Sequence, residues 1–161
     1  MTGTRITDAQ LVTLVALRWL IGWHLMYEGV AKLLNPYWTS AGYLAASNGP
    51  LSGLYVWLAS NPTRLSAVDW LNKWGLVIIG LALILGLFTH WATLAGMALL
   101  ALYYLGNIPF IGTQSPIPTE GSYLIVNKTL VELAALTVLL VFPTAKTIGL
   151  DRWIGRRGEA Q

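Results

Sequence analysis

The feature that most constrains this 161-residue chain is a run of 46 residues, 74–119, that contains no Asp, Glu, Lys or Arg. A helix crosses a membrane with about 20 apolar residues, so this run is long enough for two crossings and a turn. Only 11% of the whole chain is charged, whereas an ordinary soluble domain has about 25%. Water could not solvate such a surface on all sides, and we therefore predict an integral membrane protein whose main partner is the lipid bilayer.

We predict a single all-α domain over residues 1–161, an integral membrane four-helix bundle with a long, partly helical outer loop between helices 1 and 2. The helices are expected at about residues 9–34, 66–88, 91–108 and 123–142, followed by a basic tail over residues 143–161. The first helix begins after an N-cap at Thr7 or Asp8 and ends at Asn35-Pro36. Residues 51–60 are too few to span a membrane, and we expect a re-entrant or interfacial helix there.

The distribution of Lys and Arg predicts the orientation of the bundle. Four crossings place both termini on one side, and the basic residues on that side are Arg5, Lys146, Arg152, Arg156 and Arg157. The opposite side carries only Arg64 and Lys73. Because basic loops stay in the cytoplasm, we expect a multi-pass protein of the cell (inner) membrane with both termini cytoplasmic. The pI near 9.3 reflects this basic tail, and we predict no nucleic-acid partner.

Ionisable residues gather on one face of the first helix. At 100° per residue, His24, Glu28 and Lys32 lie at about 0°, 40° and 80°, and Arg18 lies at about 120°. A charge inside the membrane costs about 2.5–3.5 kcal/mol on the insertion scale. These side chains should therefore face the inside of the bundle and meet polar partners there.

The fourth helix carries the matching residues. Lys128 and Glu132 are four positions apart, next to Asn127. Counted from the outer ends of the two antiparallel helices, Glu28 lies as deep as Lys128, and His24 as deep as Glu132. We expect these two pairs to form in the outer half of the bilayer. They fit two interpretations, namely ion pairs that hold the bundle in register, or a polar pocket for a small ligand or a proton path.

The pocket interpretation assigns roles to individual residues. His24 beside Glu132 is suited to carry a proton near neutral pH, and the candidate catalytic residues are His24, Glu28 and Glu132. The residues expected to bind the ligand are Arg18, Trp23, Lys32, Tyr104, Asn127 and Lys128. The chain has no cysteine, which excludes thiolate catalysis and cysteine-bound clusters within it. It also has no histidine pair at metal or haem spacing, so no metal is predicted.

Several segments resemble a known family. Residues 17–33, Leu-Arg-Trp-Leu-Ile-Gly-Trp-His-Leu-Met-Tyr-Glu-Gly-Val-Ala-Lys-Leu, look like the first-helix signature of the DoxX family. The residues that carry this likeness are Arg18, Gly22, Tyr27, Gly29 and Lys32. Residues 80–89, 126–132 and 148–151 are similar as well, so the resemblance covers nearly the whole chain. It implies a four-helix membrane fold related to DoxD, a subunit of a thiosulfate:quinone oxidoreductase that couples thiosulfate oxidation to quinone reduction.

The resemblance implies a membrane subunit of a quinone-linked oxidoreductase, with quinone as its substrate. A quinone head group would enter between the first and fourth helices from the lipid, and Lys32 and Lys128 would attract a small anion such as thiosulfate. Further redox subunits are the expected partners, and a homo-oligomer is compatible with the sequence. An alternative is a non-catalytic accessory or assembly subunit of a larger respiratory or redox complex. A third is a small-solute or proton transporter, for which four helices without an internal repeat are few.

Overall fold

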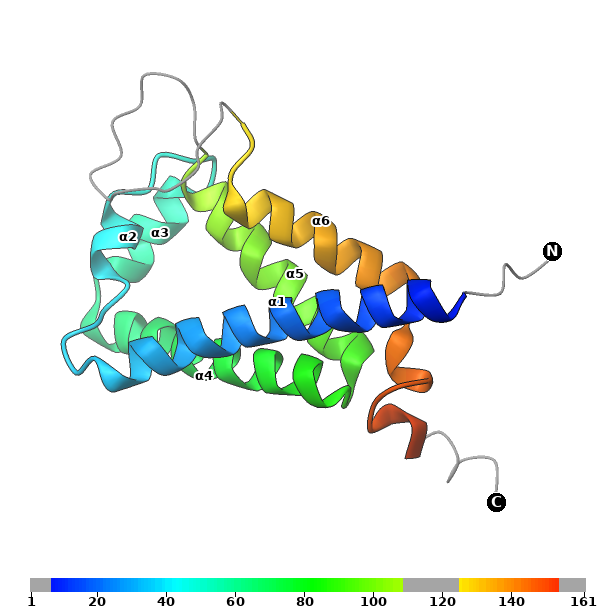
Figure 1. The fold of residues 1–161 in the computed structure, drawn as a ribbon. Helices are drawn as coiled ribbons and strands as arrows, with labels where there is room; N and C mark the ends of the chain where they lie inside the picture. The colour runs from blue at the N-terminus through cyan, green and yellow to red at the C-terminus, as the bar shows by residue number, and fades with distance from the viewer. Residues whose placement is uncertain (1–6, 109–124, 154–161) are drawn as a thin grey trace, which may run out of the picture.

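The computed structural model describes residues 7–108 and 125–153, and within these two segments all regular structure is helical (Figure 1). The predicted all-α class is therefore confirmed for this part of the chain. Four helices are long, and three are short. They are α1 (Asp8–Leu34), α2 (Ala41–Ala45), α3 (Ser52–Ala59), α4 (Pro62–Leu85), α5 (Thr89–Gly106), α6 (Lys128–Val141) and the 3-10 helix η1 (Thr144–Lys146).

The helix boundaries follow from local capping. Thr7 caps α1 in a capping box, because its hydroxyl accepts from Gln10 N and the Gln10 side chain accepts from Thr7 N. Asn61 caps α4 by accepting from the N–H groups of Thr63 and Arg64. The prediction that this helix begins at residue 66 was wrong, since Asn61-Pro62 is a helix start rather than a loop.

The turn between α4 and α5 also differs from the prediction. Gly86 ends α4 in the left-handed conformation, with φ at 66°, and Phe88 precedes α5 with φ at 47°. The turn therefore lies at residues 86–88. Thr89 and His90, predicted as part of the turn, belong to the first turn of α5. Glycine fits the helix end here because it adopts positive φ without a steric penalty.

The long helices form two antiparallel pairs, α1 with α4 and α5 with α6 (Figure 1). The backbones of α1 and α4 touch, since a Cβ added to Gly80 would lie 2.5 Å from Gly22 O and from Met26 N. The two pairs lie close together near the described chain ends and diverge toward α2 and α3 (Figure 1). The apolar core between them consists mainly of Leu25, Leu76, Leu83, Leu100 and Leu136.

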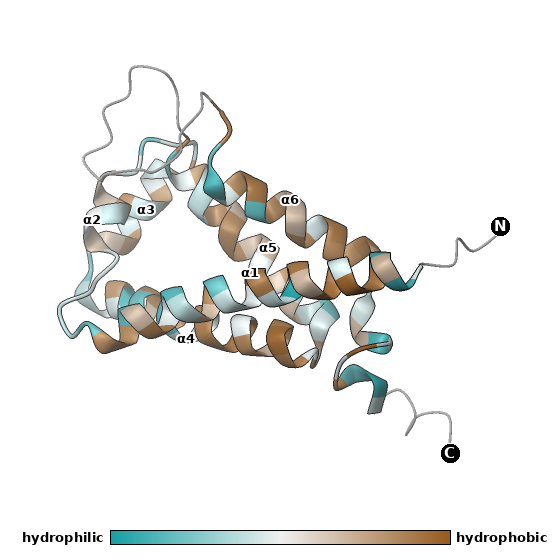
Figure 2. Cartoon of the chain, in the orientation of Figure 1, coloured by the Kyte–Doolittle hydropathy of each residue, from teal (hydrophilic) through white to brown (hydrophobic). Residues whose placement is uncertain are grey.

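Hydrophobic residues predominate along the long helices, with hydrophilic residues at a few positions (Figure 2). Two described helices, α1 and α4, are long and apolar enough to cross a membrane, and only 28% of each 18-residue apolar window is buried. The core helix of a soluble protein would be mostly buried. Large apolar side chains that remain exposed include Leu20, Tyr27, Leu71, Ile78, Trp91, Val131 and Val141. A surface of this size and composition suits lipid or another protein rather than water.

The connection between α1 and α4 packs onto the end of α5. The hydroxyls of Tyr43 and Tyr55 donate to the carbonyls of Tyr103 and Leu102 near the C-terminal end of α5. Ser47 Oγ donates to Gly106 O at 2.6 Å. The helix predicted near residues 51–60 is present as α3, and the predicted partly helical loop is therefore confirmed.

The C-terminal segment is docked rather than a free tail up to residue 153. Leu150 N donates to Leu85 O at 3.1 Å and Asp151 N to Gly86 O at 2.8 Å. The Asp151 carboxylate accepts from Phe88 N at 2.6 Å and Thr89 N at 2.9 Å, so it caps the start of α5. The predicted basic tail thus begins with a segment that packs against the bundle up to residue 153, and residues 154–161 lie outside the described part.

Candidate functional site

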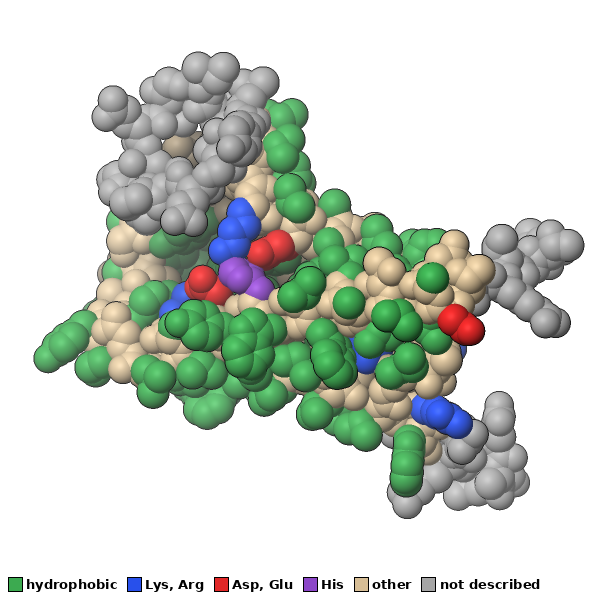
Figure 3. All heavy atoms as spheres, viewed as in Figure 1, with side chains coloured by type: hydrophobic (Ala, Val, Ile, Leu, Met, Phe, Trp, Pro, Cys, Tyr) green, Lys and Arg blue, Asp and Glu red, His purple; other side chains and the backbone are tan. Residues whose placement is uncertain are grey.

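The candidate site lies where α1 and α6 face each other. His24 Nε2 and Glu132 Oε1 are 3.3 Å apart, which confirms the pairing predicted from helix depth. These side chains are 33% and 17% exposed, so the pair is neither sealed in the core nor free on the surface. Figure 3 shows charged and histidine side chains gathered in a recess of an otherwise hydrophobic face. We call His24, Glu28, Lys32, Lys128 and Glu132 the polar cluster.

The second predicted pair, between Glu28 and Lys128, is not formed. Glu28 Oε2 instead lies 3.7 Å from the Lys32 ammonium, one turn farther along α1. The reason is the divergence of the helix pairs toward α2 and α3 (Figure 1). At the depth of Glu28, α6 is farther from α1 than it is at His24, whereas an i, i+4 partner on α1 is always within reach.

Side chains from α4, from α5 and from the connection after α1 contact Lys32. Its ammonium donates to Asn72 Oδ1 on α4 at 3.3 Å. Asn72 Nδ2 donates in turn to the Tyr103 hydroxyl on α5 at 2.6 Å. The ammonium also lies 5.2 Å from the ring centre of Trp38 and 5.6 Å from that of Tyr103, within cation–π range.

Asn72 is a site residue that the sequence interpretation missed. The available signal was an amide in the apolar helix α4, where polar side chains are rare unless they have a partner. Helical periodicity on α1 alone could not show that this amide lies beside Lys32, because the two residues come from different helices.

Arg18 does not belong to the polar cluster. Its side chain is 1% exposed and faces the docked C-terminal segment. It donates from Nη1 to Thr144 Oγ1 at 3.0 Å and from Nη2 to the Ile148 carbonyl at 2.8 Å. Both hydrogen bonds thus anchor the docked segment to α1, and the ligand-binding role of Arg18 stays a prediction. On the helical wheel Arg18 lies farthest from His24, on the side of α1 that packs against α4 and the C-terminal segment.

The remaining predicted residues are spread around the site. Trp23 is 59% exposed and points outward instead of lining the recess. Asn127 caps α6 by accepting from Leu130 N at 2.9 Å, which also corrects the predicted start of this helix from residue 123 to Lys128. Tyr104 donates to the carbonyl of Ile125 at 2.7 Å. Lys128 is exposed, and among the described residues no carboxylate lies within 4.0 Å of it.

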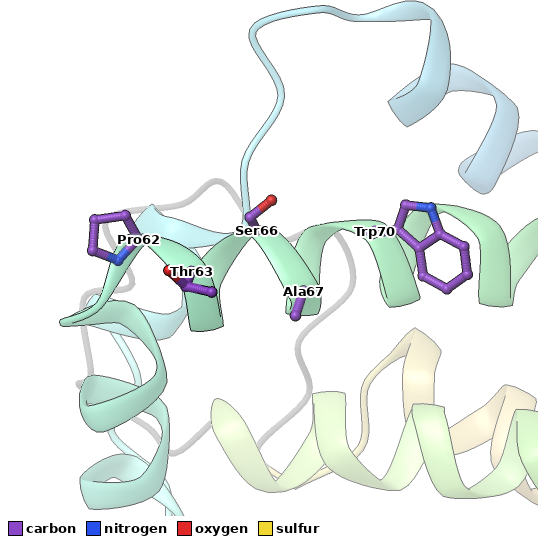
Figure 4. Close-up of a pocket in the computed structure, with 5 residues that line it drawn as sticks. All are labelled: Pro62, Thr63, Ser66, Ala67 and Trp70. Atoms are coloured by element: carbon purple, nitrogen blue, oxygen red, sulfur yellow. The ribbon is translucent and has the colours of Figure 1, made fainter.

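A second depression lies on the first turns of α4 and is separate from the polar cluster. Figure 4 shows its lining, which consists of Pro62, Thr63, Ser66, Ala67 and Trp70. It is open and contains no ionisable side chain. Its hydroxyls and indole can contact a lipid head group, but they provide no acid or base, so the polar cluster is the candidate site.

The polar cluster can perform proton transfer and hydrogen bonding. Imidazole and carboxylate groups in contact exchange a proton between them, and a lysine ammonium supplies positive charge to an oxygen of a ligand. Comparison with known protein families, with curated proteins and with solved structures finds no match to this chain.

Proposed function

We propose that the chain is a four-crossing protein of the inner membrane with both termini in the cytoplasm. The exposed apolar surface of α1 and α4 supports this proposal, and α5 and α6 pack against these helices as a second antiparallel pair. The basic residues Lys146 and Arg152 lie at the end where α1 begins and α6 ends. That arrangement agrees with the positive-inside rule.

We further propose that the polar cluster binds the head group of a quinone, in a membrane subunit of a quinone-linked oxidoreductase of the DoxX type. The observation that carries this proposal is the His24–Glu132 pair, which bridges two helices at 3.3 Å and yet remains open to the recess. An ion pair that only joined two helices would be expected to be more buried, because solvent weakens the attraction between exposed charges. Apolar side chains would also join the helices without the desolvation penalty of two charges.

Quinone chemistry consists of taking up two electrons and two protons at a pair of carbonyl oxygens. In this chain, an imidazolium at His24 would pass one proton to such an oxygen and become a neutral imidazole beside Glu132, and the second proton would be taken from water. The recess between α1 and α6 admits a ligand sideways from the lipid. The electrons come from the donor substrate or from a further redox subunit, and thiosulfate is the donor that the family resemblance implies.

Binding of decylubiquinone to the purified protein in nanodiscs tests this proposal. Quinones quench tryptophan fluorescence, and Trp19 and Trp23 precede His24 on the same helix. We expect saturable quenching by the wild-type protein and at least a tenfold weaker affinity for Glu132→Gln or His24→Phe, about the size of one charge-assisted hydrogen bond.

Thr137→Val is the matched control, because Thr137 is exposed on the same helix and its hydroxyl donates only within α6. Equal affinity of Glu132→Gln and the wild type would refute the assignment of the site. It would favour the accessory-subunit interpretation, in which the ion pair only connects α1 and α6.

A further inference from the structure

The two lysines of the polar cluster have different surroundings. The Lys32 side chain is only 16% exposed and lies between Glu28, Asn72 and two aromatic rings. Lys128 is exposed at the first residue of α6. The sequence interpretation gave both lysines the same role, that of attracting a ligand.

The contacts of Lys32 occupy most of the N–H donors and the surface that its ammonium could offer to a ligand. An ammonium has three N–H donors; Asn72 accepts one at 3.3 Å, and Glu28 lies 3.7 Å away. Two ring faces cover part of what remains. Asn72 cannot turn its oxygen away without losing the bond that its Nδ2 donates to the Tyr103 hydroxyl, at 2.6 Å.

Lys128 is placed differently. It precedes Glu132 by one turn on the same face of α6, and its charge acts on both Glu132 and Lys32. It therefore lies beside the recess. Within residues 7–108 and 125–153, no carboxylate comes within 4.0 Å of its ammonium. Because its side chain is exposed, Lys128 can reach a ligand at the mouth of the recess.

We propose a division of roles between these lysines: Lys128 contacts the ligand, and Lys32, fixed by Asn72 and Tyr103, is a positioning residue. Lys32 supplies a stationary counter-charge to Glu28. His24 and Glu132, which are in contact, are then the groups placed to exchange a proton with the ligand. This inference rests on the proposed ligand-binding function and adds to it which residues touch the ligand and which hold the charge of the site.

Site-resolved acetylation with an amine-reactive ester, read by mass spectrometry in nanodiscs, tests the Lys32 contacts without any ligand. Lys32 should react at least tenfold more slowly than Lys128. Asn72→Leu should increase the acetylation rate of Lys32. Asn72→Asp keeps an acceptor oxygen and should return that rate to the slow wild-type value. Lys146 is exposed far from the cluster and serves as the internal reference. Equal rates for Lys32 in the wild type and in Asn72→Leu would overturn the positioning role.

Decylubiquinone titration then tests the division of roles. Lys128→Gln should weaken binding about tenfold, the effect of one charged hydrogen bond. Asn72→Leu should weaken binding less than Lys128→Gln does, and it should shift the pH profile of binding. The charged and titratable groups beside Lys32 are Glu28 on α1, Tyr103 on α5 and Lys128 on α6, and Lys73 on α4 lies over the same Trp38 ring.

The two measurements separate the possible failures. If Asn72→Leu weakens binding tenfold and Lys128→Gln does not, Lys32 contacts the ligand and the division of roles is wrong. If the wild type binds no quinone while Lys32 is protected through Asn72, the proposed function and the ligand role of Lys128 fail together. The fixed counter-charge at Glu28 would then stand as a structural feature alone.

Discussion

The close contact of α1 and α4 allows a matched test of the fold with two alanine substitutions. A Cβ on Gly80 would lie 2.5 Å from Gly22 O and from Met26 N, both of which are backbone atoms. A Cβ on Gly75, in the same helix, would meet no atom within 4 Å. Gly80→Ala and Gly75→Ala therefore gain the same helix propensity, and they differ only in the clash with α1.

The expected magnitude follows from this difference. Ordinary contact begins at about 3.4 Å, and because the contacted atoms are backbone, relief requires that the helices move apart by nearly 1 Å. Overpacking of this kind costs about 1–3 kcal/mol, and helix propensity returns about 1 kcal/mol to both variants. Gly75→Ala should be neutral or slightly stabilised. Gly80→Ala should be less stable than Gly75→Ala by about 1–3 kcal/mol.

Thermal unfolding of the purified variants in one detergent, followed by circular dichroism, measures this difference. For a chain of this length, 1 kcal/mol corresponds to about 2–4 °C, so Gly80→Ala should melt roughly 2–12 °C below Gly75→Ala. Equal melting temperatures would refute the reasoning, because they would show that the backbones of α1 and α4 do not touch at Gly80.

Three further predictions follow from other contacts. Arg18→Met should lose about 2–5 kcal/mol of unfolding free energy, because two charged hydrogen bonds are removed from a buried position, whereas Arg152→Met should change the melting temperature little. Burial raises the pKa of Tyr43 above its ordinary 10.0, so the folded state holds the phenolic proton more tightly. Stability present below about pH 10 should therefore decline as the pH rises through the raised pKa, and Tyr43→Phe should flatten that decline in pH-dependent unfolding. Because the chain has no cysteine, single-cysteine variants report topology: Asn48→Cys should react with an impermeant maleimide in spheroplasts, and Thr147→Cys only after permeabilisation. Reaction at both positions before permeabilisation would contradict the proposed orientation.

The sequence was sufficient to predict the features that depend on helical periodicity. The positions of His24 and Glu132 follow from two antiparallel helices of similar depth, and the structure joins these residues at 3.3 Å. The four long helices and the helix in the outer connection were predicted from apolar length and from Asn and Pro signals. Their starts were less accurate, because Asn61 and Asn127 act as N-caps and were taken as loop or helix-interior positions.

The remaining features depend on how the helices cross, which periodicity does not contain. The contact of Asn72 with Lys32 requires the register between α1 and α4. Glu28 and Lys128, both among the described residues, form no pair because α1 and α6 diverge at that depth. Arg18 shares the charged third of the helical wheel, but its partners come from the docked segment after α6. The contacts of Arg18 depend on the path of the chain after α6, and that stretch of sequence shows no helical or strand periodicity from which the path could be predicted.

The two faces of α1 explain why a polar recess forms where it does. The face with Gly22 and Gly29 lets the backbone of α4 approach until no side chain fits between them. The face with His24, Glu28 and Lys32 carries long polar side chains, which prevent an equally close approach of α6. A helix that packs tightly on one side and loosely on the other leaves its polar face accessible along one edge of the bundle. Replacing the polar face with apolar residues would allow α6 to close onto α1, and this cost in packing supports the proposal that the His24–Glu132 pair serves ligand access.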